Sequence, residues 1–208
     1  PHGAVARLGT TRLRQPDQIG AMSFSENGKL LATVGNERIV HIWDACTGQS
    51  LQTIAFDAGS PRQVTISQDG SRVALATMVP DAVRVWQVRD GKRLLHLEAV
   101  DTAEPFAISA DCQAVASLSK RENRKERNVL RLYDSVMGNA VREWEVDAGL
   151  CSMAFSQDDQ SLVLLHRSGQ ECWLCWWDTT NGHLRRRLGC HNDSRFVRLA
   201  QRDAAIVL

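Results

Sequence analysis

The chain has 208 residues, of which 43% are hydrophobic and 24% are charged, and its formal net charge at pH 7 is +1. This composition is typical of a folded globular chain, and the charge balance gives no electrostatic reason to expect nucleic acid or a membrane as a partner. No stretch approaches the roughly 18 apolar residues that span a bilayer, and six cysteines are too few for a disulfide scaffold, so a reducing compartment such as the cytoplasm is expected.

The first predicted elements are short strands separated by turns. In chain order they are residues 22–24, the turn 25–28, residues 30–34, residues 39–43, the turn 44–48 and residues 50–54. The Asn27-Gly28 pair favours a tight turn, and residues 39–43 alternate and are rich in β-branched side chains, as a half-buried strand should be. Four antiparallel strands, here lettered a to d, in about 43 residues correspond to one propeller blade. No sustained helical periodicity follows, so helices should be nearly absent.

Two motifs then recur along the chain in one phase, which is the signature of a repeat protein. The first pairs an aromatic residue at the end of strand c with a turn ending in glycine: Trp43-Asp44, Trp86-Gln87, Tyr133-Asp134 and Trp177-Asp178. The second marks the a–b turn: Phe24-Ser25-Glu26-Asn27-Gly28, Ile66-Ser67-Gln68-Asp69-Gly70, Ile108-Ser109-Ala110-Asp111 and Phe155-Ser156-Gln157-Asp158. Leu199 to Asp203 has the form of an eroded fifth member.

These motifs resemble the WD40 repeat, and residues 6–14 resemble the outer strand that leads into the first blade of many bacterial WD40 arrays. The resemblance implies an all-β propeller of four-stranded antiparallel blades at about residues 19–60, 61–102, 103–149 and 150–192, with a partial fifth at 193–208. Residues 6–14 would supply the outer strand of a closing blade. The blade count predicts an incomplete or open ring, and we expect a fragment or an array that other segments complete.

Two departures from the family pattern affect the interior of the blades. The Gly-His before each first strand survives only as Gly189-Cys190-His191, and the Asp of the b–c turn is replaced by Glu37 in the first repeat. Because that His and Asp help to build a buried hydrogen-bond network in the family, these blades are expected to depend more on packing.

Cysteine and tryptophan residues crowd the fourth repeat. Cys172, Cys175, Cys190 and His191 have the composition of a zinc site, but residues three apart on a strand face opposite sides, so buried thiols are favoured and no metal or cofactor is expected. Trp173 and Trp177 should share one face, and Trp176 the other; an aromatic binding surface is an alternative to core packing.

The segment Lys120 to Arg127 carries five positive and two negative side chains and falls between strands b and c of the third repeat. It is predicted to be a solvated loop, either without a partner or acting as a basic finger for an acidic or phosphorylated peptide. Arg185-Arg186-Arg187 lies on a predicted outer strand, where charge commonly protects a sheet edge.

No catalytic motif is present, so an enzyme is not expected. The first hypothesis is a scaffold that binds proteins or peptides through the propeller face loops, with a regulatory or sensory segment of a larger bacterial signalling protein as the alternative and a propeller hydrolase as a weaker one. Nucleic acid, membrane and small-molecule partners are not expected. The candidate partner-binding residues are Lys120, Arg121, Arg124, Lys125, Arg127, Pro80 and Asp81.

Overall fold

Antiparallel strands make up the regular structure of the chain. The computed structural model describes residues 13, 15–16, 18–98, 105–120, 127–135, 137–147, 149–190, 197–199 and 205–207. Within these ranges no helix occurs, which confirms the all-β expectation. The described residues likewise hold no helix that is long and apolar enough to cross a membrane.

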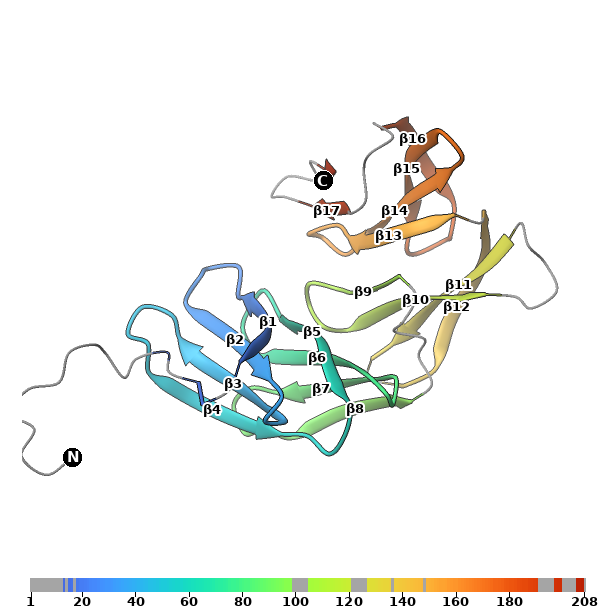
Figure 1. The fold of residues 1–208 in the computed structure, drawn as a ribbon. Helices are drawn as coiled ribbons and strands as arrows, with labels where there is room; N and C mark the ends of the chain where they lie inside the picture. Colours follow the sequence, from blue (N-terminus) through green and yellow to red (C-terminus); the bar gives the residue numbers. More distant parts are fainter. Residues whose placement is uncertain are drawn as a thin grey trace, which may run out of the picture.

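Sixteen strands form four sheets of four strands each, and in every sheet neighbouring strands are consecutive in sequence. The first sheet contains β1 (Ile19–Phe24), β2 (Leu30–Gly35), β3 (Ile39–Asp44) and β4 (Ser50–Ala55), and the second contains β5 (Ser60–Ile66), β6 (Arg72–Met78), β7 (Ala82–Gln87) and β8 (Arg93–Glu98). The third contains β9 (Phe106–Ile108), β10 (Ala114–Lys120), β11 (Arg127–Asp134) and β12 (Ala140–Asp147), and the fourth contains β13 (Leu150–Phe155), β14 (Ser161–Ser168), β15 (Glu171–Asp178) and β16 (Leu184–Gly189). The sheets follow one another in an open arc (Figure 1).

The core lies between consecutive sheets. Val34 and Ile42 of the first sheet pack with Ile66 of the second, and corresponding apolar clusters join the second sheet to the third and the third to the fourth. Strands b and c are therefore buried on both faces: in β3, Val40 and Ile42 are fully buried on one face, and His41 on the other face is 8% exposed. The half-buried strand expected at residues 39–43 is thus wrong, because the second sheet covers the face with Val40 and Ile42, while Glu37 and the Trp43 ring contact His41 on the other face.

The serine-containing motif closes each a–b turn with the same hydrogen bonds. In the second sheet the Ser67 hydroxyl donates to Asp69 Oδ1 at 2.7 Å and accepts the Arg72 N–H at 2.9 Å. The equivalent serines Ser25, Ser109 and Ser156 make the same pair of contacts. Such local side-chain bonds compete with continued strand pairing and so reverse the chain at a fixed residue.

The residue that ends the a–b turn is in the left-handed region in all four sheets. Glycine occupies it in the first two, with φ of +65° at Gly28 and +73° at Gly70, whereas Cys112 (+56°) and Asp159 (+57°) occupy it in the third and fourth. Both substitutes reach the preceding sheet. The Cys112 thiol lies 3.6 Å from the Thr65 carbonyl, and Asp159 accepts the Ala110 N–H at 2.7 Å. A contact between sheets thus accompanies a conformation that non-glycine residues rarely adopt.

The aspartate after the strand-c aromatic caps the c–d turn. Asp44 Oδ1 accepts the backbone N–H groups of Thr47 at 2.7 Å and Cys46 at 3.0 Å. Asp178 accepts the Thr180 N–H at 2.7 Å in the same way. This explains why Asp follows the aromatic residue at this point of the repeat, because its carboxylate satisfies N–H groups that the turn leaves unpaired.

The strand-c aromatic is hydrogen-bonded in the first sheet and packed in the others. Trp43 Nε1 donates to Thr33 Oγ1 at 2.8 Å, and the Thr33 hydroxyl donates to Gln15 Oε1 at 2.7 Å. The residues that replace Thr33 in the register of the other sheets are Leu75, Ser117 and Leu164. The expected reliance on packing therefore describes the strand-c aromatics of the later sheets, while that of the first sheet takes part in a short chain of hydrogen bonds.

Two further strands follow the fourth sheet. β17 (Val197–Leu199) pairs antiparallel with β18 (Ala205–Val207), and β17 lies against β13. Of the outer strand expected at residues 6–14, only Leu13 is among the described residues, and its N–H donates to the Gly48 carbonyl at 3.0 Å. The rest of that prediction lies outside them.

Candidate interaction surface

The b–c turn and the preceding d–a loop meet at one end of the second sheet. In an up-and-down sheet these two connections lie at the end opposite to the a–b and c–d turns. Ser60 in β5 pairs with Met78 in β6, so the loop that precedes β5 adjoins the turn that follows β6. A Cβ on Gly59 would lie 2.6 Å from Thr77 Cβ. We refer to residues 57–62 and 78–81 as the second-sheet rim.

A buried arginine joins the two parts of this rim. Arg84 lies in β7 and is 1% exposed; its Nη2 is 3.1 Å from Asp57 Oδ1, and its Nη1 donates to Thr77 Oγ1 at 3.0 Å. Thr77 Oγ1 lies 3.1 Å from the Pro80 carbonyl, to which its hydroxyl donates. The guanidinium thus bridges the d–a loop and the foot of the b–c turn. Because a buried cation is costly without partners, this arrangement fixes both connections.

The first sheet holds the same loop from its other side. Arg38 Nη1 donates to the Asp57 carbonyl at 3.3 Å, and the Phe56 N–H donates to the Arg38 carbonyl at 3.0 Å. A hydrogen bond from its own backbone N–H, followed by the charge of Arg84, lowers the pKa of Asp57 against the opposing effect of burial. The carboxylate is therefore ionised at neutral pH and pairs with the arginine.

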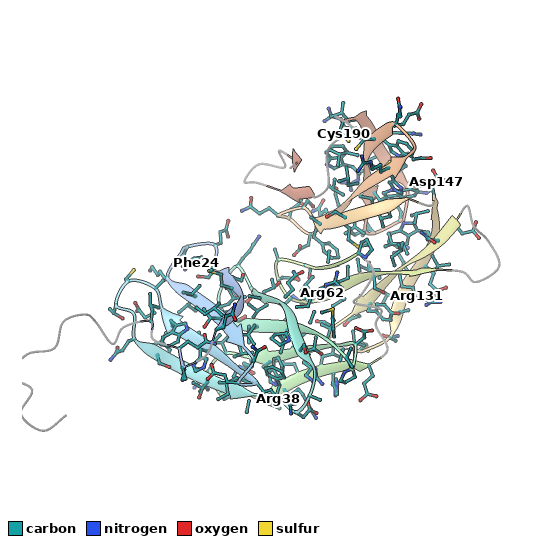
Figure 2. The ribbon with its side chains drawn as sticks, viewed as in Figure 1. Phe24, Arg38, Arg62, Arg131, Asp147 and Cys190 are labelled. Atoms are coloured by element: carbon teal, nitrogen blue, oxygen red, sulfur yellow. The ribbon has the colours of Figure 1, made fainter. Side chains whose placement is uncertain are left out.

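Apolar and cationic side chains project from this anchored framework. Val79 is 88% exposed with φ of +47°, a region that β-branched residues rarely adopt, and it precedes a cis peptide bond to Pro80. Met78 is 36% exposed, and its sulfur lies 3.9 Å from Arg62 Nη1. The Arg62 guanidinium (labelled in Figure 2) also lies 5.3 Å from the centre of the Phe106 ring, so the rim contacts β9 of the third sheet. Exposed apolar residues on a rigid turn are suited to contact a partner.

Comparison with known proteins adds to this geometry. No protein-family profile matches the chain. The chain is 34% identical over 73 residues to Protein Atg16l2 of Mus musculus, which is 34% of this chain and 12% of that protein. It is 30% identical over 63 residues to a WD repeat-containing protein of Synechocystis, covering 30% and 18%, and 24% identical over 155 residues to Protein tipD of Dictyostelium discoideum, covering 73% and 22%.

A solved structure matches almost the whole chain. Hydrazine synthase of Kuenenia stuttgartiensis superposes with a TM-score of 0.63 at 17% identity, over 95% of this chain and 54% of that one. At this identity the match shows the fold and not the activity. The chain is therefore similar to WD40-repeat proteins, and its four-stranded antiparallel sheets have the form of propeller blades. The matched segments cover 12–28% of the curated relatives, so the chain spans only part of each.

The four blades locate some of the residues that the sequence singled out. Pro80 and Asp81 lie in the b–c turn of the second blade, within the rim. Lys120 and Arg127 end β10 and begin β11, where Lys120 pairs with Asn128. Arg121, Arg124 and Lys125 lie outside the described residues. The structure therefore shows the two strands that flank the basic segment, and the side chains of that segment stay predictions.

The cysteines of the suspected zinc site in β15 lie on opposite faces of the fourth blade. Cys172 belongs to the cluster around Val163, whereas Cys175 belongs to the cluster between the third and fourth blades, so the two face opposite sides as the alternation predicted. His191 lies outside the described residues. No group of three or more metal-ligating side chains occurs in the part of the chain that the structure describes.

The tryptophans and arginines of this blade serve its own packing. Trp173 and Trp177 pack on one face and Trp176 on the other. Arg185 bridges to Asp178 at 2.6 Å, and Arg187 lies 4.3 Å from the centre of the Trp173 ring. Charge on this exposed edge strand is thus tied to neighbouring side chains, in agreement with edge protection.

Sequence reasoning missed Arg84 and Arg62 as organisers of the rim. The sequence did hold a signal for Arg84, which lies between Val83 and Val85 in a central strand. If both faces of that strand are packed, the arginine is buried and needs an anionic partner. Nothing in the sequence indicated that Asp57 supplies it. The position of Arg62 over Phe106 depends on the packing of two blades and has no local signal.

Proposed function

We propose that this chain is a scaffold that binds a protein segment at the second-sheet rim and at the basic segment of the third blade, residues 120–127. The observation that carries the proposal is the anchoring of an exposed apolar turn by a buried arginine, which pairs with the exposed carboxylate of Asp57. Arg84 and Thr77 hold the turn from below, and Val79 stands in solvent above them. A rigid turn loses little conformational entropy on binding, which favours a contact role over a mobile loop.

The positive charge of residues 120–127, together with Arg62 on the rim, supports an acidic peptide as the partner. Arg62 lies on the rim itself, and the sequence between β10 and β11 adds Arg121, Arg124 and Lys125 at the corresponding b–c connection of the third blade. Guanidinium groups form paired hydrogen bonds with carboxylates, so an acidic segment with an apolar residue would use both parts of the surface. No catalytic step is part of this proposal.

A matched pair of charge-reversal variants tests the proposal. One variant replaces Arg121, Arg124 and Lys125 by Glu; the control replaces Arg89, Lys92 and Arg93, which lie at the c–d turn of the second blade, at the opposite end of the sheets. Both change the net charge equally. Binding to an array of acidic, neutral and basic peptides is measured together with the urea midpoint.

We expect the first variant to lose its acidic ligands while the control keeps them, with urea midpoints unchanged in both. Val79→Ser should weaken the same ligands without altering their salt dependence, because it removes an apolar contact and no charge. Equal losses in the two charge variants would reduce the effect to overall charge and would contradict a binding site at this rim.

A further inference from the structure

Two cysteines of the fourth blade lie directly opposite each other on neighbouring strands. The register of β15 and β16 pairs Trp173 with Gly189 and Leu174 with Leu188, so the next pair outward is Cys172 with Cys190. The Cys190 N–H donates to the Cys172 carbonyl at 2.9 Å, which confirms that the pairing continues to this point. The two residues are 18 positions apart in sequence and adjacent in the sheet.

Their side chains share one face of the blade. Cys172 is one of the buried residues of the cluster formed with Val163, Leu165 and Leu174, and Cys190 packs against the same cluster. Cys172 is 5% exposed, whereas Cys190 is partly exposed at the end of the outer strand (Figure 2). A reagent in solution therefore reaches Cys190 first.

The backbone spacing suits a covalent link. Residues directly opposite each other in an antiparallel pair have Cα atoms about 4.5–5.5 Å apart, and disulfides join Cα atoms about 4.4–6.8 Å apart. Both cysteine side chains leave the sheet on the same side, so closing the link requires side-chain rotation rather than a change of strand pairing. The sheet already holds the two residues together.

We propose that Cys172 and Cys190 form a reversible thiol–disulfide site that reacts with low-molecular-weight disulfides of the glutathione type. The Cys190 thiolate attacks one sulfur of the small disulfide; the S–S bond of the reagent breaks, one small thiolate leaves, and a mixed disulfide forms on Cys190. The Cys172 thiolate then attacks Cys190 Sγ and expels the second small thiolate. Two protein thiols are oxidised, and one small disulfide is reduced to two thiols, so the electrons balance.

The other cysteines whose side chains the structure describes lack one of the two requirements. Cys112 is buried, and burial raises the pKa of its thiol to about 12, so it presents almost no thiolate to a reagent. Cys175 lies three residues after Cys172 in β15, on the opposite face of the blade, and burial likewise raises the pKa of its thiol. Cys46 is exposed in the c–d turn of the first blade, far from both residues of the site.

A closed disulfide would tie the end of β16 to β15 where the chain leaves the fourth blade. Without it, this end of the outer strand is held by non-covalent contacts such as the Cys190 N–H bond to Cys172 and the Arg187 side chain over the Trp173 ring, and every residue of β16 is exposed. The site would therefore set how firmly the last strand of the blade is attached. This inference is independent of the proposed binding rim.

The full chain is equilibrated in mixtures of reduced and oxidised glutathione, trapped by alkylation and digested with trypsin. Trypsin cuts after Arg185, Arg186 and Arg187 and thereby separates the two cysteines, so a disulfide appears as two joined peptides. The expected result is one joined pair, 172 with 190, that increases with the oxidised fraction and is reversed by a thiol reductant. Cys175→Ser, on the same strand but the opposite face, should leave it unchanged.

Single replacements separate the two chemical steps. Cys172→Ser should accumulate the mixed glutathione disulfide on Cys190, because the resolving thiol is missing, whereas Cys190→Ser should leave Cys172 reduced. Absence of the joined pair in the wild-type chain across the glutathione range, or joining of Cys190 to a different cysteine, would overturn the proposal. A mixed disulfide on Cys172 in Cys190→Ser would contradict the assigned order of attack.

Discussion

Strands β1 and β5 carry the same motif at the start of neighbouring blades and differ in what covers them. Ile66 in β5 is 3% exposed, and Phe24, the equivalent residue of β1, is 56% exposed; Val64 and Met22 differ in the same way, at 4% and 61%. β5 is inserted against the apolar face of the first blade, and no described strand covers the same face of β1. The motif sets the turn and the direction of the side chain, and the neighbouring blade supplies the burial.

The polar interiors of the two blades differ as well. The first blade links Trp43 to Thr33 and pairs Glu37 with His41 at 2.7 Å, so its strand-c polar group has a partner within the same blade. In the second blade Arg84 occupies the place of His41 and takes its anion from Asp57, in the loop between the blades. The strand-c polar group of the first blade is thus paired within its own blade, whereas that of the second blade is paired with the loop that joins it to the first.

The largest expected effect concerns Trp86, which is 3% exposed and packs between the first and second blades. Trp86→Ala should lower the free energy of unfolding by about 3–5 kcal/mol, because it opens a cavity at a junction that cannot fully collapse. Urea denaturation followed by circular dichroism measures the change. A loss below about 1 kcal/mol would show that the repeat register is misplaced.

A smaller effect should separate the equivalent residues Ile66 and Phe24. Ile66→Ala is expected to cost about 2–4 kcal/mol, whereas Phe24→Ala, which removes a larger but exposed side chain, should cost less than about 1 kcal/mol. Paired urea titrations of the two variants give the comparison directly. If Phe24→Ala were the more damaging change, the face of β1 would be covered in solution and the contrast between the two strands would fail.

The ion pair between buried Arg84 and the exposed carboxylate of Asp57 gives the next contrast. Asp57→Ala leaves the buried guanidinium of Arg84 with Thr77 as its remaining partner and should cost about 1–3 kcal/mol. Arg84→Met removes the charge and keeps the volume, so it should be nearly neutral or stabilising, and should loosen the b–c turn. Thermal unfolding reports the first effect and proteolysis within residues 78–81 the second. Equal destabilisation by both changes would argue against a stabilising role of the carboxylate.

The smallest expected effect depends on pH and concerns Asp159 in the place that Gly28 has in the first blade. Burial raises the pKa of Asp159 from 3.8 to about 6, although the N–H groups of Ala110 and Asp111 favour its ionised form. A raised carboxyl pKa means that the folded state holds the proton more tightly than the unfolded state. The stability that protonated Asp159 contributes to the folded state is present below about pH 4 and is lost as the pH rises through about 6.

Asp159→Asn should therefore flatten the dependence of the melting temperature on pH between about 4 and 6, and leave the rest of the profile unchanged. The nearby Asp158 is a suitable control, because hydrogen bonds from Ser156 and the Gln160 N–H lower its pKa instead. Asp158→Asn should remove stability that is present above about pH 4. It should leave the slope of the melting temperature against pH unchanged between about 4 and 6. An unchanged pH profile in Asp159→Asn would contradict the raised pKa.

The sequence predicted the elements whose cause is local. The a–b turn needs a serine that bonds the residue two positions later, and the c–d turn needs a carboxylate after the strand-c aromatic, so both motifs can be read from neighbouring residues. Alternation likewise placed Cys172 and Cys175 on opposite faces of β15. The turn motifs repeat because in each blade the turn is closed by hydrogen bonds between residues that are close in sequence.

The candidate surface could be predicted only in part, because it depends on contacts between blades. The b–c turn was found from Pro80 and Asp81, yet the residues that hold it come from the loop before β5 and from the centre of β7. The exposure of Phe24 could not be read from its motif either, since Ile66 has the same motif and is buried. What lies across a blade junction has no signature in a single repeat.

Hydrogen–deuterium exchange of the whole chain tests the central claim, a run of blades that share one register, most directly. We expect four protected blocks in strands b and c, at residues 30–44, 72–87, 114–134 and 161–178, each interrupted at its b–c turn, with faster exchange in β1 than in β5. Protection that ignores this phase, or slow exchange in β1 equal to that in β5, would contradict the assigned blades and the difference between the first blade and the second.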